Sequence, residues 1–205
     1  MTTALAQDVV IIDAGGANLG SVRAAFTRLG VEPEVSRDPV RIAAASKLVL
    51  PGVGAAAPVM RNLRDNGIDE LLRGSTTPLL GICIGMQVLF ERSEEGNVAG
   101  LGLLPGEVRK LPTTPGVRLP HMGWNRLDKR APSPLLDGID DDAQAYFVHS
   151  YGVVGSSDTI LETTHGDAFA AAVARGHIAG AQFHPERSGA VGARFLRNFL
   201  DWQPR

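Results

Sequence analysis

Hydrophobic residues in the first half of the chain fall into short continuous runs that alternate with predicted helices. Each run is apolar along most of its length, as expected for a strand that is buried on both faces of a parallel sheet. The runs occupy residues 9–13, 47–50 and 78–82, and a further short strand, which is mostly polar, is predicted at residues 34–36. Helices are predicted at residues 18–29, where Gly30 acts as a stop signal, and from about residue 55 to residue 65. This alternation predicts an α/β fold with an open, mostly parallel sheet flanked by helices.

The second half of the chain has a different pattern, in which prolines, glycines and an acidic turn at residues 140–142 separate short strand-like runs. These runs are residues 106–111, 125–128, 145–148, 159–162 and 169–173. A buried strand at residues 178–183 and an amphipathic helix at residues 189–202 follow. Because there is no linker, internal repeat or low-complexity segment, we expect a mixed or antiparallel extension of the same sheet. The whole chain, residues 1–205, is then one domain.

The composition is that of a soluble globular protein. Of the 205 residues, 44% are hydrophobic and 20% are charged, and the formal net charge is −2. This charge gives no reason to expect nucleic acid or an acidic membrane surface as a partner. The N-terminus has no signal-peptide pattern, and no apolar run approaches the ~18 residues of a membrane span. A single cysteine fits a reducing compartment, so we expect a cytoplasmic protein.

That cysteine lies at the end of a predicted strand, between two glycines. Gly81 precedes Cys83 by two residues, Gly85 follows it by two, and residues 86–92 have apolar side chains at helical spacing. This is the G-x-nucleophile-x-G elbow with cysteine in place of serine, in which the glycines permit a strained backbone and close packing. The N-terminus of the following helix favours the thiolate. The alternative is an inert, buried cysteine.

A histidine and an acid follow the predicted strand at residues 178–183. Pro185 keeps His184 extended, so the side chains of His184 and Glu186, two residues apart, can face one site. With Cys83 they supply a nucleophile, a base and an acid that orients the base. A surface turn is the alternative for these three residues taken alone.

Two glycine-containing loops also follow predicted strands. Pro51-Gly52-Val53-Gly54 ends the strand at residues 47–50, at the edge where open α/β sheets bind ligands; an ordinary connector is the alternative. The glycines of residues 15–20 do not meet the G-x-G-x-x-G spacing. A tight turn is therefore favoured there over a non-catalytic nucleotide-binding module.

Together these motifs resemble those of the class I (triad) glutamine amidotransferases. Residues 81–87, Gly-Ile-Cys-Ile-Gly-Met-Gln, are similar to the nucleophile motif, and residues 184–186 to the other two triad members. The resemblance extends from about residue 9 to residue 200. It implies the hydrolysis of L-glutamine through a thioester by Cys83, His184 and Glu186. The chain departs from the family's usual Asp-Tyr-Gly-x-Gly-Asn-Leu at residues 13–19, where Ala14 and Ala17 replace tyrosine and glycine.

The resemblance also implies which residues bind the substrate, and it implies no metal and no cofactor. The oxyanion hole would be formed by the backbone N–H groups of Val53 and Ile84. The implied substrate-binding residues are Gly52, Gln87, Glu95, Ser150 and Tyr151. For Glu95 alone, a solvated surface acid is the alternative. Because Gly52 and Gly54 tolerate both signs of φ, we expect the Gly52–Val53 peptide to rotate and so to add or remove one oxyanion donor.

Three stretches resemble the members of the family that deliver ammonia to a (β/α)8-barrel cyclase subunit in a heterodimer. They are residues 51–54, residues 121–125 (His-Met-Gly-Trp-Asn) and residues 146–151. The candidates for the surface that contacts this partner are Asn18, Met122, Trp124, Asn125 and Arg187. A core position is the alternative for Trp124. Two other functions stay open: an amidotransferase of another pathway, and a free-standing cysteine hydrolase.

Overall fold

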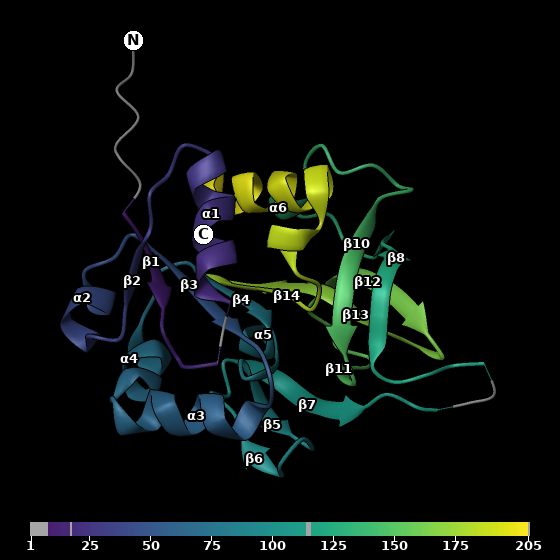
Figure 1. Cartoon of the computed structure of the whole chain (residues 1–205), viewed down its shortest axis with the longest axis horizontal. Helices are drawn as coiled ribbons and strands as arrows, with labels where there is room; N and C mark the ends of the chain where they lie inside the picture. The colour runs from purple at the N-terminus through teal and green to yellow at the C-terminus, as the bar shows by residue number, and fades with distance from the viewer. Residues whose placement is uncertain (1–7, 17, 114–115, 205) are drawn as a thin grey trace.

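The computed structural model describes residues 8–16, 18–113 and 116–204, and its main feature is a mixed sheet with helices on both faces (Figure 1). The departure from the family pattern at Ala17 lies outside the described residues. Eight described strands form the main sheet, in the order β2-β1-β3-β4-β14-β13-β12-β9. The first five are parallel to one another and the last three are antiparallel. The expected α/β class is therefore confirmed.

The parallel half of the sheet is built from the apolar runs of the sequence and one short, mostly exposed edge strand. Its strands are β1 (Val9–Ile12), β2 (Glu34–Ser36), β3 (Lys47–Gly52), β4 (Leu79–Cys83) and β14 (Ile178–Ala181). Every residue of β1, β3, β4 and β14 is buried, as continuous apolar strands in the middle of a sheet require. In the register of β3 and β4, Gly52 pairs with Cys83. The glycine loop and the cysteine therefore lie at the same carboxyl edge.

The antiparallel half extends this sheet, as expected, but two further sheets lie beside it. The extension consists of β13 (Asp167–Arg175), β12 (Thr159–His165) and β9 (Asp128–Lys129). A two-stranded sheet pairs β8 (His121–Arg126) with β10 (Gln144–His149). A four-stranded sheet joins β11 (Tyr151–Val153), β7 (Leu104–Lys110), β5 (Phe90–Ser93) and β6 (Val98–Ala99). The strand expected at residues 125–128 is in fact the end of β8 and the start of β9.

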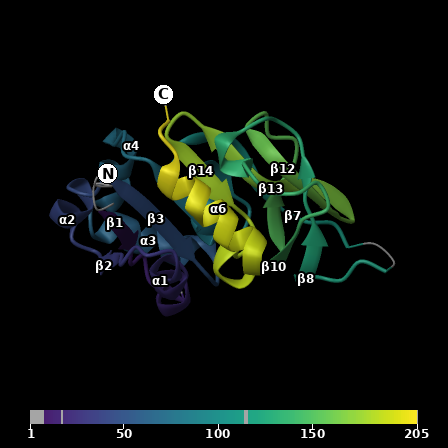
Figure 2. The same ribbon diagram turned by 90° about the horizontal axis from the view of Figure 1, so that it is seen from above.

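Helices cover both faces of the parallel half. Figure 1 shows α1 (Leu19–Arg28) and α6 (Gly189–Asp201) on one face and α3 (Ala56–Asp65) and α4 (Ile68–Gly74) on the other. Figure 2, from above, shows α1 and α6 side by side. The short elements α2 (Pro39–Ala43), η1 (Pro134–Leu136) and η2 (Pro185–Arg187) complete the fold. The sequence analysis had predicted α1, α3 and α6, but not α2 or α4.

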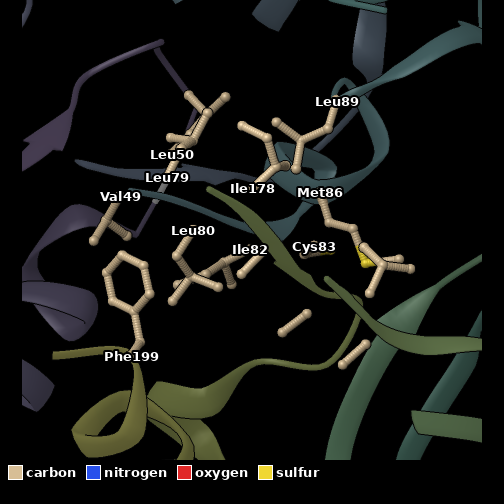
Figure 3. Packing of buried hydrophobic residues seen from close by; sticks show 14 of the residues in the cluster. Val49, Leu50, Leu79, Leu80, Ile82, Cys83, Met86, Leu89, Ile178 and Phe199 are labelled. Atoms are coloured by element: carbon tan, nitrogen blue, oxygen red, sulfur yellow. The ribbon is translucent and has the colours of Figure 1, made fainter. Parts of the chain in front are cut away.

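Side chains from β3 and β4 alternate between the two faces and form the core (Figure 3). Val49 and Leu80 point toward Phe199 of α6, whereas Leu50 and Leu79 point to the opposite face. Cys83, at the end of β4, belongs to the same buried cluster. The nucleophile candidate is thus attached to the packed core of the molecule.

The prediction of a helix at residues 86–92 is wrong. A single turn, α5 (Ile84–Gln87), follows Cys83, and the chain then enters strand β5. Within β5 Phe90 and Ser93 are buried and Glu91 and Arg92 are exposed, while the backbone pairs with β7. A short apolar run is compatible with the periodicity of a helix or of a strand, and here pairing with distant residues stabilises the strand. Stabilisation of a thiolate by a helix N-terminus is therefore limited to one turn.

Two glycines of the elbow are required by close backbone contacts. A Cβ at Gly85 would lie 1.7 Å from the carbonyl oxygen of Leu50 in β3, and one at Gly81 would lie 2.6 Å from the carbonyl oxygen of Gly85. Real Cβ atoms do not approach backbone this closely, so any larger residue would push α5 away from β3 and β4. The glycines therefore fix the position of the turn that carries Cys83.

Candidate active site

Cys83 is the last residue of β4, and its backbone is strained. Its φ of 55° and ψ of −111° lie in a region that side-chain-bearing residues rarely adopt. Within the described chain only Asn97 is another non-glycine residue with positive φ. Strain of this kind is held in place by surrounding packing and is typical of the nucleophile in a strand-to-helix elbow. The side chain is 3% exposed and is a free thiol.

His184 and Glu186 lie just beyond β14, the strand next to β4. The His184 backbone N–H donates to the Tyr146 carbonyl, which anchors the segment to β10. The Nδ1 atom of His184 is 2.8 Å from Oε1 of Glu186, and both side chains are almost fully buried. A carboxylate accepts this bond only from a protonated Nδ1, so Glu186 fixes the orientation of the imidazole ring.

The opposite edge of the imidazole ring is available for chemistry. The Nε2 atom of His184 is buried and has no hydrogen-bond partner among the described residues. Burial has the largest single influence on the pKa of His184 and lowers it, but the interactions with Cys83 and Glu186 together raise that pKa to about 10. His184 is therefore protonated at neutral pH and stabilises a negative charge on the sulfur of Cys83.

A cavity of about 310 Å³ opens over these residues. Cys83 and His184 line it together with six of the residues predicted from the sequence to stabilise the oxyanion or to bind substrate: Val53, Ile84, Gln87, Glu95, Ser150 and Tyr151. Gly52 lies beneath the elbow, where a Cβ would be 2.9 Å from the Gly85 nitrogen. The structure thus places Gly52 against the elbow rather than on the cavity wall. A cavity of this size is at the lower end of the ~300–1,000 Å³ typical of ligand sites.

Two polar side chains in the cavity are held by the protein itself. Oε2 of Glu95 accepts a hydrogen bond from the Ala56 N–H at the start of α3, and burial raises the pKa of this carboxyl. Gln87 is 1% exposed, and its Nε2 donates to Tyr151 and Gln182 while its Oε1 has no partner. Glu95 is thus not the freely solvated surface acid of the alternative interpretation. A ligand with an ammonium group fits the charge of Glu95 and the free oxygen of Gln87.

The candidate partner surface divides into exposed and internally bonded residues. Met122 and Trp124, on one face of β8, are 63% and 56% exposed, which excludes the core position for Trp124. The Arg187 guanidinium lies 4.6 Å from the centre of the Tyr146 ring, which in turn meets Trp124 edge to face. By contrast, the Asn125 amide donates to the Thr164 carbonyl, and Asn18 caps α1 by accepting from the Ser21 N–H. An exposed patch at η2 is therefore formed by Met122, Trp124, Tyr146 and Arg187.

Gly15 and Gly16 lie in a bend after β1, whereas Gly20 lies within α1. Gly15 and Gly16 both have positive φ, and the Gly15 N–H donates to the carboxylate of Asp13. The carbonyl of Ala14 accepts from Asn62 of α3. These contacts tie the loop to the protein and agree with the tight turn that the spacing favoured.

Gln182 and His149 lie at the site but were not among the predicted site residues. Gln182 is completely buried, and its Nε2 is 3.8 Å from the sulfur of Cys83. His149 lines the cavity and is 6% exposed. Gln182 precedes His184 by two residues, so alternation along the extended chain was a signal for it. For His149, the only signal in the sequence was its position within residues 146–151.

Residues 8–16, 18–113 and 116–204 contain no group of three or more His, Cys, Asp or Glu side chains able to hold a metal ion. They also contain no helix that is long and apolar enough to cross a membrane.

Comparison with known proteins agrees with the fold. The family model for "Glutamine amidotransferase class-I" matches residues 10–202. Two solved structures share the fold: a glutamine amidotransferase (TM-score 0.74, 21% identity, 94% of this chain and 97% of that one) and a glutamine amidotransferase from Thermotoga maritima (TM-score 0.62, 18% identity, 96% and 82%). The chain belongs to the class I glutamine amidotransferases and is an enzyme of that class.

Its curated relatives define the family more narrowly. The chain is 55% identical to the imidazole glycerol phosphate synthase subunit HisH of Xanthomonas euvesicatoria pv. vesicatoria over 95% of this chain and 97% of that protein. It is 54% identical to the HisH subunit of Xylella fastidiosa (strain Temecula1) over the same shares. Within its class, the chain therefore falls among the HisH subunits.

Proposed function

We propose that this chain is the glutaminase subunit of an imidazole glycerol phosphate synthase. It hydrolyses L-glutamine to glutamate and ammonia, and it passes the ammonia to a (β/α)8-barrel cyclase subunit. The cyclase then makes imidazole glycerol phosphate and AICAR in histidine biosynthesis. The observation that carries the proposal is the buried Cys83, which lines a cavity of amino-acid size together with His184, whose ring is oriented by Glu186.

The chemistry follows from the positions of the triad. The Cys83 thiolate attacks the side-chain amide carbon of glutamine, and the oxyanion that forms is stabilised by the backbone N–H groups of Val53 and Ile84. His184 then gives its proton to the departing ammonia, which leaves a thioester. Neutral His184 next takes a proton from water as the water attacks the thioester, and glutamate is released with the thiolate restored. Glu186 keeps the ring oriented in both steps.

The substrate's amino-acid head is recognised by polar groups that line the cavity. Glu95 pairs with its ammonium group, and the free Oε1 of Gln87 accepts a further N–H. Ser150 and Tyr151, at the junction of β10 and β11, also line the cavity and contact the rest of the head. The raised pKa of Glu95 reflects its burial without a cation, which the ammonium group of glutamine supplies.

The proposal is tested by measuring glutamate release with and without the cyclase subunit and its acceptor substrate. We expect little turnover by the chain alone and strong activation by the loaded cyclase, together with ammonia-dependent formation of imidazole glycerol phosphate. Full turnover by the isolated chain would instead favour a free-standing hydrolase. Failure of the gene to restore growth of a histidine auxotroph would favour an amidotransferase of another pathway.

Trp124→Ala is expected to weaken binding to the cyclase about thirtyfold, because an exposed aromatic anchor at an interface centre contributes ~2 kcal/mol or more. Trp124 is 56% exposed, so the melting temperature should hardly change. Binding is measured by titration calorimetry alongside thermal unfolding. Trp202, which is 8% exposed, provides the control: Trp202→Ala should destabilise the fold instead. Unchanged affinity of the folded Trp124→Ala chain would remove Trp124 from the interface.

A further inference from the structure

Besides His184, the sulfur of Cys83 has two polar neighbours: the Val148 carbonyl oxygen at 4.0 Å, which accepts from the thiol, and the side-chain amide of Gln182. Gln182, which follows β14, is completely buried, and its Nε2 lies 3.8 Å from Sγ of Cys83. We propose that this amide N–H stabilises the thiolate of Cys83, and that Gln87 and the Tyr151 carbonyl hold the amide in the orientation that this requires. The inference rests on the proposed glutaminase function and adds a group that contacts its nucleophile.

The orientation of the Gln182 amide is fixed by the backbone carbonyl of Tyr151, through the side chain of Gln87. The carbonyl oxygen of Tyr151 can only accept, so the group of Gln87 that lies 2.9 Å from it must be the NH₂. The same NH₂ lies 3.0 Å from the Gln182 amide, which must therefore present its oxygen to Gln87. Its NH₂ is then left facing the sulfur. Reversing either amide would place two donors or two acceptors against each other in a buried site.

The Tyr151 carbonyl is itself held from its other side by a pair of buried histidines. Nδ1 of His149 lies 2.7 Å from this oxygen and must carry a proton, which leaves Nε2 of His149 to accept from Nδ1 of His121 at 3.1 Å. Nε2 of His121 in turn faces the Asn125 amide at 3.2 Å. Burial lowers the pKa of His149 to about 3 and that of His121 to about 4, so both rings are neutral at pH 7. Each ring nitrogen then has a partner of the right kind.

These bonds form one directed network from β8 to the nucleophile. Asn125 and the two histidines connect β8 to the Tyr151 carbonyl. From the same carbonyl, hydrogen bonds continue through Gln87 and Gln182 to Cys83. Every polar atom along it is committed except Oε1 of Gln87, which is buried without a partner. The bonds from Gln87 hold the Gln182 amide in one orientation, so the N–H that faces the sulfur stays in place during turnover.

The N–H of Gln182 stabilises the sulfur together with protonated His184, both before the attack on glutamine and when the thioester adduct collapses. His184 gives up its proton as ammonia leaves, and it takes a proton from water when the thioester is hydrolysed. As the tetrahedral adduct of the thioester collapses, the C–S bond breaks and its electron pair stays on the sulfur. A fixed N–H donor stabilises that charge without itself being deprotonated.

Gln182→Glu tests the proposal with a change of one group. A carboxylate still accepts from Gln87, but it places an oxygen where the N–H faced the sulfur. Because Cys83 is the only cysteine, its reaction with iodoacetamide reports the thiolate without any glutaminase assay. We expect the alkylation rate at neutral pH and the kcat of the cyclase complex to fall roughly tenfold to a hundredfold, with little change in KM. Gln144→Glu is the matched control, because Gln144 is exposed at the start of β10.

Gln182→Met is the second variant, used if Gln182→Glu does not fold, because Met fills a similar volume and has no N–H donor. Folding is checked by thermal unfolding. A folded variant with the wild-type alkylation rate and kcat would overturn the role of Gln182. A wild-type chain that is alkylated readily but releases no glutamate with the loaded cyclase would overturn the proposed function instead. The alkylation rates would then still decide whether Gln182 stabilises the thiolate.

Discussion

Replacing Cys83 with serine should abolish glutamine hydrolysis by the cyclase complex, with a loss of about 10⁴-fold or more. A serine hydroxyl is a far weaker acid than a thiol, so the charge of protonated His184 does not ionise it. Serine is close to cysteine in size, and Cys83 lies in a packed core, so the fold should be retained. Glutamate release by the purified complex measures the effect.

Ammonium salts supply the control for this experiment. The cyclase needs only ammonia, so the Cys83→Ser complex should still form imidazole glycerol phosphate when ammonium is added in place of glutamine. Loss of both activities would mean that the substitution disturbs the partner rather than the chemistry. Retention of glutamine-dependent activity would exclude Cys83 as the nucleophile, and with it the thioester mechanism.

The predictions that succeeded are those in which local sequence and tertiary contacts favour the same structure. The strands β1, β3, β4 and β14 are buried on both faces, and their continuous apolar runs are visible without any knowledge of their neighbours. The elbow was predictable for a similar reason. Only glycine fits at Gly81 and Gly85, so the close backbone contacts around Cys83 can be predicted from the glycines in the sequence.

The predictions that failed or were missed depend on residues far apart in the chain. Residues 90–93 form a strand because residues 104–108 pair with them, and no local pattern indicates that pairing. His121 and His149 meet because β8 and β10 are antiparallel with these two residues in register. Gln182 reaches the sulfur because β14 lies beside β4. A single sequence shows such residues as ordinary polar positions, and only the strand order brings them together.

The structure also sharpens the expected rotation of the Gly52–Val53 peptide. A substitution at Gly52 is an unsuitable test, because a Cβ there would lie 2.9 Å from both the Gly85 nitrogen and the Cβ of Ile84 and would disturb the elbow itself. Val53 provides a better one. Rotating the peptide changes ψ of Gly52 and φ of Val53 together, and Val53 is not among the residues with positive φ. A half-turn therefore carries Val53 toward positive φ, which costs a β-branched residue ~1–3 kcal/mol, whereas Gly52 adapts freely.

Val53 thus holds the peptide in its present orientation, and the rotated peptide is the state that we expect the loaded cyclase to favour. Val53→Gly should raise glutamate release by the free chain about tenfold to a hundredfold, because glycine removes the ~1–3 kcal/mol penalty. The ratio by which the loaded cyclase activates the enzyme should fall to the same extent. The backbone N–H of residue 53 is retained, and the Val53 side chain is 40% exposed, so no large cavity is created.

Val53→Ala is the matched control. Alanine also loses the branched side chain, but it keeps a Cβ and therefore most of the penalty at positive φ, so its activation ratio should stay close to that of the wild type. Rates are measured for the free chain, with the cyclase, and with the cyclase and its acceptor. If Val53→Gly binds the cyclase normally and keeps the wild-type activation ratio, the Gly52–Val53 peptide is not the switch. Activation must then act elsewhere in the site, as on the alignment of His184 with Cys83.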